Sequence, residues 1–365
     1  MAAGLTDERR STMNTVASGQ TPPGSRSMML TVAKVIDETA DARSFVFDVP
    51  DEREDRFGYR PGQFLTVRIP STRTGSVARC YSLSSSPDVD AELKITVKRT
   101  ADGYGSNWLC DNVGAGDTLE VLPPAGVFTP ADLNRELTLW AGGSGITPVM
   151  SILKSVLTAG TGRLTLVYAN RDEQSVIFAD ELRALTSQHP QRLTVIHWLE
   201  SLLGLPSRRQ LAGLAAAYTR DESFLCGPAP FMDAVRQALA GTGVARSSIH
   251  TEVFVSLTGD PFSEALGDEP TSQEPGAARA EVDLDGHRHV LRWPRTANLV
   301  EAMLARGLDV PYSCREGHCG SCACTLVSGE VDPGNTEILD QQDIADGIML
   351  ACQARPVSDE IRIEF

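Results

Sequence analysis

The sequence predicts a multidomain protein in which an antiparallel β-barrel is followed by an α/β unit with a parallel sheet and then by a small α+β unit. Three observations support this prediction. Short alternating strands fill the first third, apolar strands alternate with helical periodicity in the middle, and five of the eight cysteines fall in the last sixth of the 365 residues. A chain of this length is also too long for one ordinary core.

Residues 28–131 form the first predicted unit. Its short strands are separated by turns that contain Gly and Pro, such as residues 60–62, and this spacing is typical of a β-barrel. The clearest strands are Ser44–Val49, Phe64–Ile69 and Leu93–Val97.

Residues 132–254 form the second unit, where apolar strands are each followed by helical periodicity. This alternation indicates a parallel sheet covered on both faces by helices. The predicted strands are Leu137–Ala141, Leu164–Tyr168, Leu193–His197 and Ser223–Cys226.

Polar segments flank these units. Residues 1–27 are rich in Ser, Thr, Gly and Pro and predict a disordered tail, and residues 255–278 predict a solvated linker. The third unit, residues 279–365, opens with two short strands around Asp285-Gly286, a pair that favours a hairpin turn.

The net charge of the chain indicates which classes of partner it can bind. A formal net charge of -15 disfavours binding to nucleic acid and to anionic membranes, and a basic partner surface suits it better. No stretch reaches the roughly 18 to 20 apolar residues of a membrane span. The pair Arg9–Arg10 is not followed by the apolar run of an export signal, so we expect a cytoplasmic protein.

The cysteine cluster is the most specific signal in the sequence. Cys314-x4-Cys319-x2-Cys322 is followed by Cys352 after 29 intervening residues, the spacing of plant-type [2Fe–2S] proteins. Structural zinc is the alternative, but zinc ribbons usually pair two C-x2-C knuckles. The sequence therefore predicts these four cysteines as ligands of a [2Fe–2S] cluster.

Other residues around the cluster carry weaker signals. Gly317 and Gly320 let the loop curl so that N–H groups face the sulfur atoms. Cys324 is expected to be a buried apolar thiol and not a fifth ligand. His318 is either an exposed loop residue or a group that tunes the cluster.

Four short segments have the composition of cofactor-binding loops, although each also has an ordinary structural explanation. Gly142–Pro148 follows an apolar strand and precedes a helix, with Thr147 expected as N-cap and Pro148 as the first helical residue. The other segments are Arg79–Ser82, a strand whose alternate residues share one face; Gly103–Asn107, a flexible turn before a helix; and Cys226–Pro230, a second strand end.

In this order, the motifs resemble the ferredoxin–NADP⁺ reductase-like flavoproteins, in particular the branch with a C-terminal plant-type ferredoxin domain. The resemblance covers nearly all of residues 28–365. It implies an FAD-binding barrel, an NAD(P)H-binding α/β domain and a ferredoxin-like β-grasp domain, in that order. FAD, NADH and a [2Fe–2S] cluster are the implied cofactors, and NADPH in place of NADH stays open.

The same resemblance assigns residues to FAD. It implies that Arg79 binds the FAD phosphate, that Tyr81 lies against the isoalloxazine and that Ser82 lies near its reactive N5 atom. The remaining residues implied to bind FAD are Gly105, Ser106 and Asn107 for the pyrophosphate, and Val97 and Lys98 beside the ribityl and adenosine portion.

Further residues are assigned to the nicotinamide dinucleotide. The resemblance implies that it binds to the loop containing Gly143, Gly145, Ile146, Thr147 and Pro148. A second group, Cys226, Gly227 and Pro228, is implied to bring a thiol to the nicotinamide ring, and Glu252-Val253-Phe254 implies Phe254 over the flavin face. Ser82, Cys226 and Phe254 are thus the predicted catalytic residues.

Three longer stretches narrow the branch to the reductases of steroid-hydroxylating oxygenases: Thr100–Trp108, Tyr168–Gln174 and Glu252–Gly259. The partner implied is a separate terminal oxygenase, of the Rieske non-haem iron type. Reductases of phenylacetyl-CoA oxidation share the domain order, so a phenylacetyl-CoA oxygenase or an aromatic-ring oxygenase is the alternative partner, and the substrate of the oxygenase stays open. Residues 278–365 hold fifteen Asp and Glu against eight Arg and no Lys, which favours docking on a basic surface.

The chemistry explains why three modules would occur together. A hydride carries two electrons and the cluster accepts one, so a flavin must stand between them. A ferredoxin-like binding protein without reductase activity would not explain two glycine-rich strand ends. A stand-alone hydroxylase would need its own oxygen-activating metal, and the six histidines form no clear facial triad.

Overall fold

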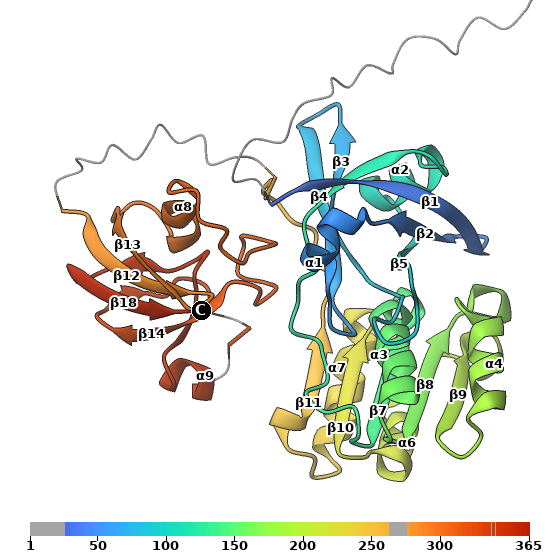
Figure 1. Ribbon diagram of the computed structural model, residues 1–365. Coiled ribbons are helices and arrows are strands. Elements are labelled where there is room, and N and C mark those ends of the chain that lie inside the picture. The colour runs from blue at the N-terminus through green and yellow to red at the C-terminus, as the bar shows by residue number, and fades with distance from the viewer. Residues whose placement is uncertain (1–25, 263–275, 337, 340) are drawn as a thin grey trace, which may run out of the picture.

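The structure is a computed structural model that describes residues 26–262, 276–336, 338–339 and 341–365. Three units are visible in Figure 1, with the barrel above the nucleotide unit and the third unit to one side. Most of the predicted tail and the middle of the predicted linker lie outside the described residues. Of the tail, Arg26 is described, and it forms an ion pair with Asp309 of the third unit.

The first unit is an antiparallel sheet that closes into a barrel, as predicted. Its strand order is β4-β3-β6-β1-β2-β5, and a bridge between Leu83 and Ile95 brings the two ends of the sheet together. The elements are β1 (Met28–Thr39), β2 (Ala42–Asp48), α1 (Glu54–Phe57), β3 (Phe64–Ser71), β4 (Gly75–Ser82), β5 (Leu93–Lys98), α2 (Tyr104–Asn112) and β6 (Thr118–Val121).

The second unit is a parallel sheet with the order β11-β10-β7-β8-β9. Adjacent residues of its central strand face opposite sides: Leu139 belongs to the core under α3, whereas Trp140 belongs to the core under α6 and α7. Helices therefore cover both faces, as predicted. The elements are β7 (Leu137–Gly142), α3 (Ile146–Ala159), β8 (Leu164–Asn170), α4 (Ala179–Gln188), β9 (Leu193–Leu199), α5 (Glu200–Leu203), α6 (Arg208–Tyr218), β10 (Glu222–Cys226), α7 (Ala229–Ala240) and β11 (Ile249–Glu252).

The third unit is a mixed five-stranded sheet with the order β13-β12-β18-β14-β16, packed against α8. The predicted hairpin is present, since Asp285 and Gly286 both have positive φ between β12 and β13. The elements are β12 (Ala278–Leu284), β13 (His287–Trp293), α8 (Leu299–Leu304), β14 (Ala323–Ser328), β15 (Val331–Asp332), α9 (Gln341–Ala345), β16 (Ile348–Leu350), β17 (Arg355–Pro356) and β18 (Glu360–Glu364).

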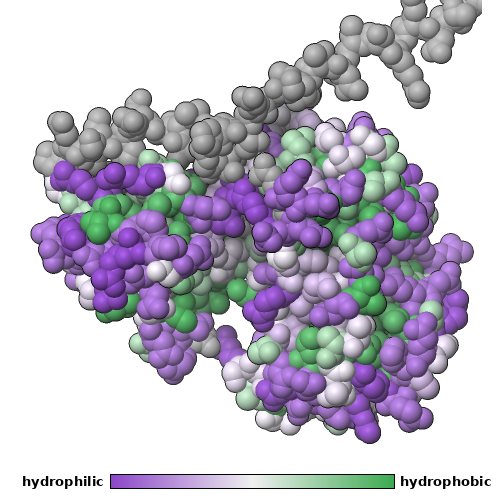
Figure 2. Space-filling view, in the orientation of Figure 1, coloured by the Kyte–Doolittle hydropathy of each residue, from purple (hydrophilic) through white to green (hydrophobic). Residues whose placement is uncertain are grey.

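The start of the segment expected to be a solvated linker is packed instead. Leu257 is 6% exposed and Phe262 is 8% exposed, and both belong to the core of the third unit. Barrel residues such as Phe64 and Ala78 belong to the same core. Leu257 and Phe262 are buried because they fill the contact between barrel and third unit, whereas Val255 at the start of the segment is exposed. On the face drawn in Figure 2, most of the remaining surface is hydrophilic.

Candidate functional site

A pocket of about 430 Å³ lies where the barrel meets the nucleotide unit. Strand β4, strand β5 and the start of α2 form its barrel side, the loop before α3 forms its nucleotide side, and the chain after β11 crosses it. The lining residues are Arg79, Cys80, Tyr81, Ser82, Thr96, Lys98, Thr100, Asp102, Gly103, Tyr104, Gly105, Ser106, Ser144, Thr147, Phe254, Val255 and Ser256.

Most residues predicted to bind FAD meet in this pocket. Arg79, Tyr81 and Ser82 reach it from β4, Lys98 reaches it from the end of β5, and Gly105 with Ser106 reaches it from α2. Burial raises the pKa of the Tyr81 phenol, so its hydroxyl group stays protonated. The Arg79 guanidinium also donates to the Leu257 carbonyl oxygen at 3.2 Å.

Two residues predicted to bind FAD do not line the pocket. Val97 is fully buried in the barrel core, because strand alternation turns Thr96 and Lys98 to the pocket and Val97 away from it. The Asn107 amide donates to the Thr100 and Gly103 carbonyl oxygens at 3.0 and 2.8 Å. Asn107 therefore shapes the turn that carries the lining residues.

The start of α2 fits a phosphate group. This helix has nine residues, and its N-cap residue Gly103 makes no side-chain hydrogen bond to the first turn. The first N–H groups of a helix without such a cap are available to an anion. Arg79 and Lys98 in the same lining add positive charge. The donor groups of the pocket thus match the diphosphate of FAD.

The glycine-rich loop of the nucleotide unit begins its helix earlier than predicted. Gly145 is the N-cap residue of α3, after a short 3₁₀ turn, and the Thr147 hydroxyl donates to the Ser144 carbonyl oxygen at 3.1 Å. Thr147 is therefore the second helical residue and not the N-cap. Pro148 is the third, which is tolerated because N–H groups of the first turn have no partner within the helix.

Close backbone contacts explain the glycines of this loop. A Cβ atom on Gly145 would lie 2.1 Å from the Cys226 carbonyl oxygen, and one on Gly227 would lie 2.9 Å from the Gly142 nitrogen. Gly143 has φ +52°. These glycines bring the ends of β7 and β10 together, and such strand ends are where ligands bind in open parallel sheets.

The predicted nicotinamide residues are only partly brought together. Ser144, which was not predicted, and Thr147 line the pocket, whereas Ile146, Pro148 and Cys226 are buried beneath it. Burial raises the pKa of the Cys226 thiol well above its usual value. The structure does not bring this thiol into the lining as the sequence predicted, because the strand end that carries it is covered by the glycine loop.

Phe254 is 47% exposed and lines the pocket. The ring is therefore open to the pocket and not fully buried, and its location over the flavin face stays a prediction. Two positions earlier, Glu252 ends β11 beside Cys226. Glu252 is partly exposed as a residue, but its carboxyl group is enclosed by protein, and this burial raises its pKa to about 8.

The strand end of β8 holds a residue that sequence reasoning did not assign. Asn170 is 9% exposed, and within the described chain neither of its amide atoms has a partner with hydrogen-bonding geometry. Such a group is costly unless something binds it. The neighbouring Arg171 pairs with Asp41 at 2.9 Å, and the Asp172 side chain caps the next turn. These groups fit a dinucleotide at this edge of the sheet.

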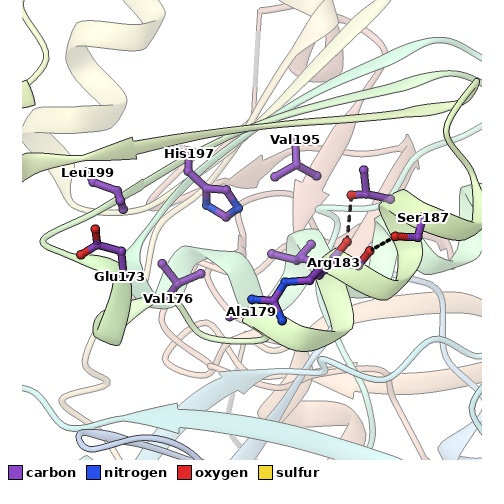
Figure 3. Close-up of a pocket in the computed structure, with 10 residues that line it drawn as sticks. Glu173, Val176, Ala179, Arg183, Ser187, Val195, His197 and Leu199 are labelled. Carbon is purple, nitrogen blue, oxygen red and sulfur yellow. Dashed lines mark hydrogen bonds between the residues drawn. The ribbon is translucent and has the colours of Figure 1, made fainter. Parts of the chain in front are cut away.

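Figure 3 shows a second cavity, of about 460 Å³, between α4 and the edge strand β9. The His197 imidazole points toward it, and burial lowers the pKa of this histidine. Glu173 and Arg183 also line this cavity, together with apolar side chains. Glu173 belongs to the same turn as Asp172, so the cavity adjoins the end of β8.

The four predicted cluster ligands are all buried, with 2% to 8% of their surface exposed, and none forms a disulfide. They form two pairs. A hydrogen bond between Cys314 and Cys319 lowers the pKa of Cys314, and one between Cys322 and Cys352 lowers the pKa of Cys352. The same hydrogen bonds raise the pKa of the partner thiols Cys319 and Cys322, so each pair shares one proton. A bound metal ion would displace this proton, and each pair would then supply two thiolates.

This pairing fits two iron ions better than one zinc ion. In the described part of the chain, no three His, Cys, Asp or Glu side chains are grouped around one possible metal position. A zinc site with four thiolates needs all of them around one point. A [2Fe–2S] cluster needs two thiolates for each iron, because the sulfides complete the coordination.

The loop around the thiols has the curled backbone predicted from its glycines. Gly317 and Gly320 have φ +78° and +71°, and the N–H groups of Glu316 and His318 donate to the Cys314 sulfur at 3.4 Å. Gln353 was not predicted, and its amide donates to the Cys352 sulfur at 3.3 Å and to the Arg315 carbonyl oxygen at 3.2 Å. Such donors stabilise negative charge on the thiolates.

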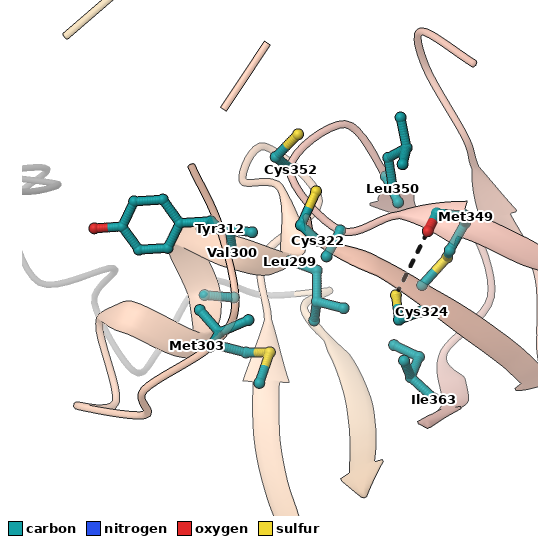
Figure 4. Close-up of a cluster of buried hydrophobic side chains, with 14 of the residues drawn as sticks. Leu299, Val300, Met303, Tyr312, Cys322, Cys324, Met349, Leu350, Cys352 and Ile363 are labelled. Atoms are coloured by element: carbon teal, nitrogen blue, oxygen red, sulfur yellow. Dashed lines mark hydrogen bonds between the residues drawn. The ribbon is translucent and has the colours of Figure 1, made fainter. Parts of the chain in front are cut away.

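Cys324 lies apart from the ligands in the apolar core, as expected for a structural thiol. Its S–H group donates to the Met349 carbonyl oxygen at 3.8 Å, and Figure 4 shows it among the buried side chains of the third unit. Within the described residues, no helix has the length and apolar character needed to cross a membrane.

Comparison with known families assigns each unit. An oxidoreductase FAD-binding domain matches residues 29–129, an oxidoreductase NAD-binding domain matches residues 139–237, and a 2Fe-2S iron-sulfur cluster binding domain matches residues 282–357. The protein therefore combines binding units for FAD, NAD and a [2Fe–2S] cluster in one chain.

Several known proteins match this chain over nearly its whole length and over nearly their own whole length. The chain is 62% identical over 347 residues to the 3-ketosteroid-9-alpha-monooxygenase ferredoxin reductase component of Rhodococcus rhodochrous, covering 95% of this chain and 99% of that protein. One component of the 1,2-phenylacetyl-CoA epoxidase of Escherichia coli is 32% identical, covering 92% and 97%. Among solved structures, phthalate dioxygenase reductase has a TM-score of 0.53 at 25% identity, covering 93% and 98%.

Proposed function

The chain belongs to the family of 3-ketosteroid-9-alpha-monooxygenase ferredoxin reductase components, and from this premise we propose that it supplies electrons from NADH to a steroid-oxidising oxygenase. The observation that supports this proposal most directly is the position of β4. One strand contributes Arg79 and Tyr81 to the cofactor pocket, while Ala78 contacts the unit that contains the cluster thiols.

Different residues of the chain would bind the phosphates of FAD, its ring and the iron–sulfur cluster. When bound, FAD accepts the hydride of NADH, which carries two electrons, and the cluster takes the electrons one at a time. Arg79, Lys98 and the start of α2 hold the FAD phosphates. Tyr81 and Phe254 would enclose the ring, and Ser82 would lie near its reacting nitrogen. Cys314, Cys319, Cys322 and Cys352 hold the two irons.

The partner is a terminal oxygenase of the Rieske type, which binds the steroid itself. Two properties of the third unit support the proposal that this unit docks on a basic surface: fifteen acidic side chains against eight Arg, and the absence of Lys from residues 278–365. Cysteines kept as free thiols suit the reducing environment of the cytoplasm, which we propose as the location of the protein.

A phenylacetyl-CoA oxygenase is the second candidate partner, because a relative with that activity in its name covers nearly the whole chain. Sequence identity favours the steroid oxygenase as partner, because the steroid-system relative is 62% identical and the phenylacetyl-CoA relative is 32% identical. The residues of the FAD pocket do not distinguish the two partners, since the reductase does not contact the substrate of the oxygenase.

The test is reconstitution with purified components. The protein is first titrated anaerobically with NADH, which should bleach the flavin and then the cluster. It is then mixed with a purified 3-ketosteroid oxygenase or a purified phenylacetyl-CoA oxygenase, together with NADH and the matching substrate. We expect product from the steroid system only. Product from the second system only would assign the other partner, and a protein without flavin would overturn the reductase function.

A further inference from the structure

Strand β4 separates the cofactor pocket from the unit that holds the cluster. Its alternate residues Arg79 and Tyr81 line the pocket. The intervening residues contact the third unit: Ala78 lies in its core and Cys80 packs against that core, while Cys80 also borders the pocket. A single strand therefore lies between the two redox sites.

A chain of buried hydrogen bonds crosses from this strand to the cluster loop. Thr66 lies opposite Cys80 in the β3–β4 pair, and its hydroxyl oxygen lies 3.4 Å from the Cys80 sulfur. The same oxygen lies 2.7 Å from the hydroxyl oxygen of Ser313, in the third unit. Thr66 is 0% exposed and Ser313 is 1% exposed, and Ser313 directly precedes the predicted ligand Cys314.

Two further contacts hold the same loop. The Glu316 carboxylate accepts hydrogen bonds from the Thr258 nitrogen and hydroxyl at 2.8 and 2.9 Å and from the Gly259 nitrogen at 2.5 Å. The Gly126 nitrogen of the barrel donates to the Ser321 hydroxyl at 3.2 Å. The cluster loop is thus fastened on both sides of Cys314 and again beside Cys322.

From this geometry we propose that Thr66 and Ser313, with Cys80, are positioning residues for electron transfer from the flavin to the cluster. They fix the Cys314 side of the loop against β4, the strand that also lines the flavin pocket. This inference rests on the proposed function, because it assumes that electrons pass from FAD to the cluster. The reduced flavin would lose one electron and one ferric iron of the cluster would gain it, and no bond between heavy atoms is made or broken.

Fixing the separation matters because electron transfer slows steeply as two centres move apart. The apolar contacts between the units stabilise their association but do not fix one orientation, because the hydrophobic effect is not directional. A hydrogen bond between two buried hydroxyl groups has a defined distance and angle. Replacing Thr66 by Val keeps the side-chain shape and leaves the Ser313 hydroxyl without this partner. The docked arrangement should then be populated less often.

The test compares Thr66→Val and Ser313→Ala with the parent protein, loaded with FAD and cluster. Anaerobic stopped-flow mixing with NADH measures flavin bleaching and cluster reduction separately. We expect unchanged flavin bleaching and cluster reduction about tenfold slower, the effect of one lost hydrogen bond on a docking equilibrium. Thr66→Ser keeps the hydroxyl group and should restore the parent rate.

A matched control and a second readout complete the design. Ser86 and Ser155 form a similar buried hydroxyl pair at 2.8 Å between barrel and nucleotide unit, so Ser155→Ala should leave cluster reduction unchanged. Hydrogen exchange of the amides of residues 313–322 should rise in Thr66→Val and not in Ser155→Ala. Parent-like exchange and cluster reduction in Thr66→Val would overturn the inference. A parent protein that bleaches no flavin would instead overturn the proposed function.

Discussion

The barrel contacts both neighbours through apolar and polar side chains, but only one of the two contacts leaves an open pocket. Toward the nucleotide unit, the Lys154–Asp90 ion pair at 2.6 Å and the Phe128–Phe224 contact join the units, and a pocket of about 430 Å³ is open between them. Toward the third unit, apolar side chains including Phe64 and Leu122 join a shared core. One boundary leaves space between the units, and the other is filled.

The difference matches what has to cross each boundary. A dinucleotide must enter, react and leave, so its boundary needs room and groups that bind reversibly. An electron needs only a fixed separation, so its boundary can be closed and dry. The predictions below test whether the two boundaries can be disturbed independently.

Removing a predicted cluster ligand should give the largest effect. It should block electron transfer through the third unit and leave reduction of the flavin intact. Cys319→Ser should lower cytochrome c reduction by more than roughly 100-fold, since even indirect partners of metal ligands change function by about 10- to 100-fold. Bleaching of the flavin by NADH should persist, because hydride transfer precedes the cluster. Loss of both activities in a folded, FAD-containing variant would contradict this order of centres.

Adding a side chain at Gly145 should instead disturb the nucleotide unit beside the open pocket. Gly145→Ala would place a Cβ atom 2.1 Å from the Cys226 carbonyl oxygen, so the loop or strand β10 must move. We expect NADH-dependent flavin bleaching to fall by about tenfold or more and thermal stability to fall, as overpacking costs about 1–3 kcal/mol. Reduction of flavin and cluster by dithionite should be unaffected.

Gly213→Ala is the control for that substitution. Gly213 lies in α6 with no atom within 4 Å of a Cβ atom placed there, and alanine should stabilise the helix by about 0.5–1 kcal/mol. If Gly145→Ala and Gly213→Ala had the same unfolding midpoint, the close contact would not be the reason for the glycine.

The sequence predicted the elements and the cysteine cluster because these follow from local patterns, whereas the residues assigned to FAD and nicotinamide came from the resemblance to known flavoproteins. The strand runs, the Asp285-Gly286 turn and the cysteine spacing are each determined by neighbouring residues. The contacts made at a distance were not predictable in this way. Thr66 and Ser313 are 247 positions apart, and nothing in either segment indicates the other. The burial of Leu257 was also not predictable, because the residues around it are polar and predicted a solvated linker.

Truncating Phe254 should have a smaller effect, confined to the open boundary. Loss of an aromatic stacking contact of about 0.5–1.5 kcal/mol should let the nicotinamide ring compete more easily for the flavin face. We therefore expect Phe254→Ala to bind NAD⁺ about 2- to 10-fold more tightly. Its inhibition constant from steady-state kinetics with added NAD⁺ measures this directly, and discrimination between NADH and NADPH should relax.

Val253→Ala provides the comparison for Phe254. Val253 is 55% exposed and does not line the pocket, so NAD⁺ inhibition should match that of the parent protein. An unchanged inhibition constant in a destabilised Phe254→Ala variant would mean that the ring is structural and does not gate the flavin.

The smallest effect at fixed pH should come from Glu252, which lies opposite Cys226 at the end of β11. Burial raises its pKa from 4.5 to about 8 in the folded protein. The folded state therefore binds this proton more tightly than the unfolded chain does. Its contribution to stability is complete below about pH 4.5 and is lost as the pH rises toward 8.

Glu252→Gln replaces the protonated carboxyl group by a neutral amide of nearly the same shape. At pH 5 the unfolding midpoints of variant and parent should be similar, and the midpoint of the variant should fall less than that of the parent between pH 5 and pH 8. Glu92→Gln, at an exposed position, should follow the parent at every pH. Parallel pH profiles for Glu252→Gln and the parent would show that this carboxyl group titrates as an exposed one does, so that water reaches the strand end beneath the glycine loop.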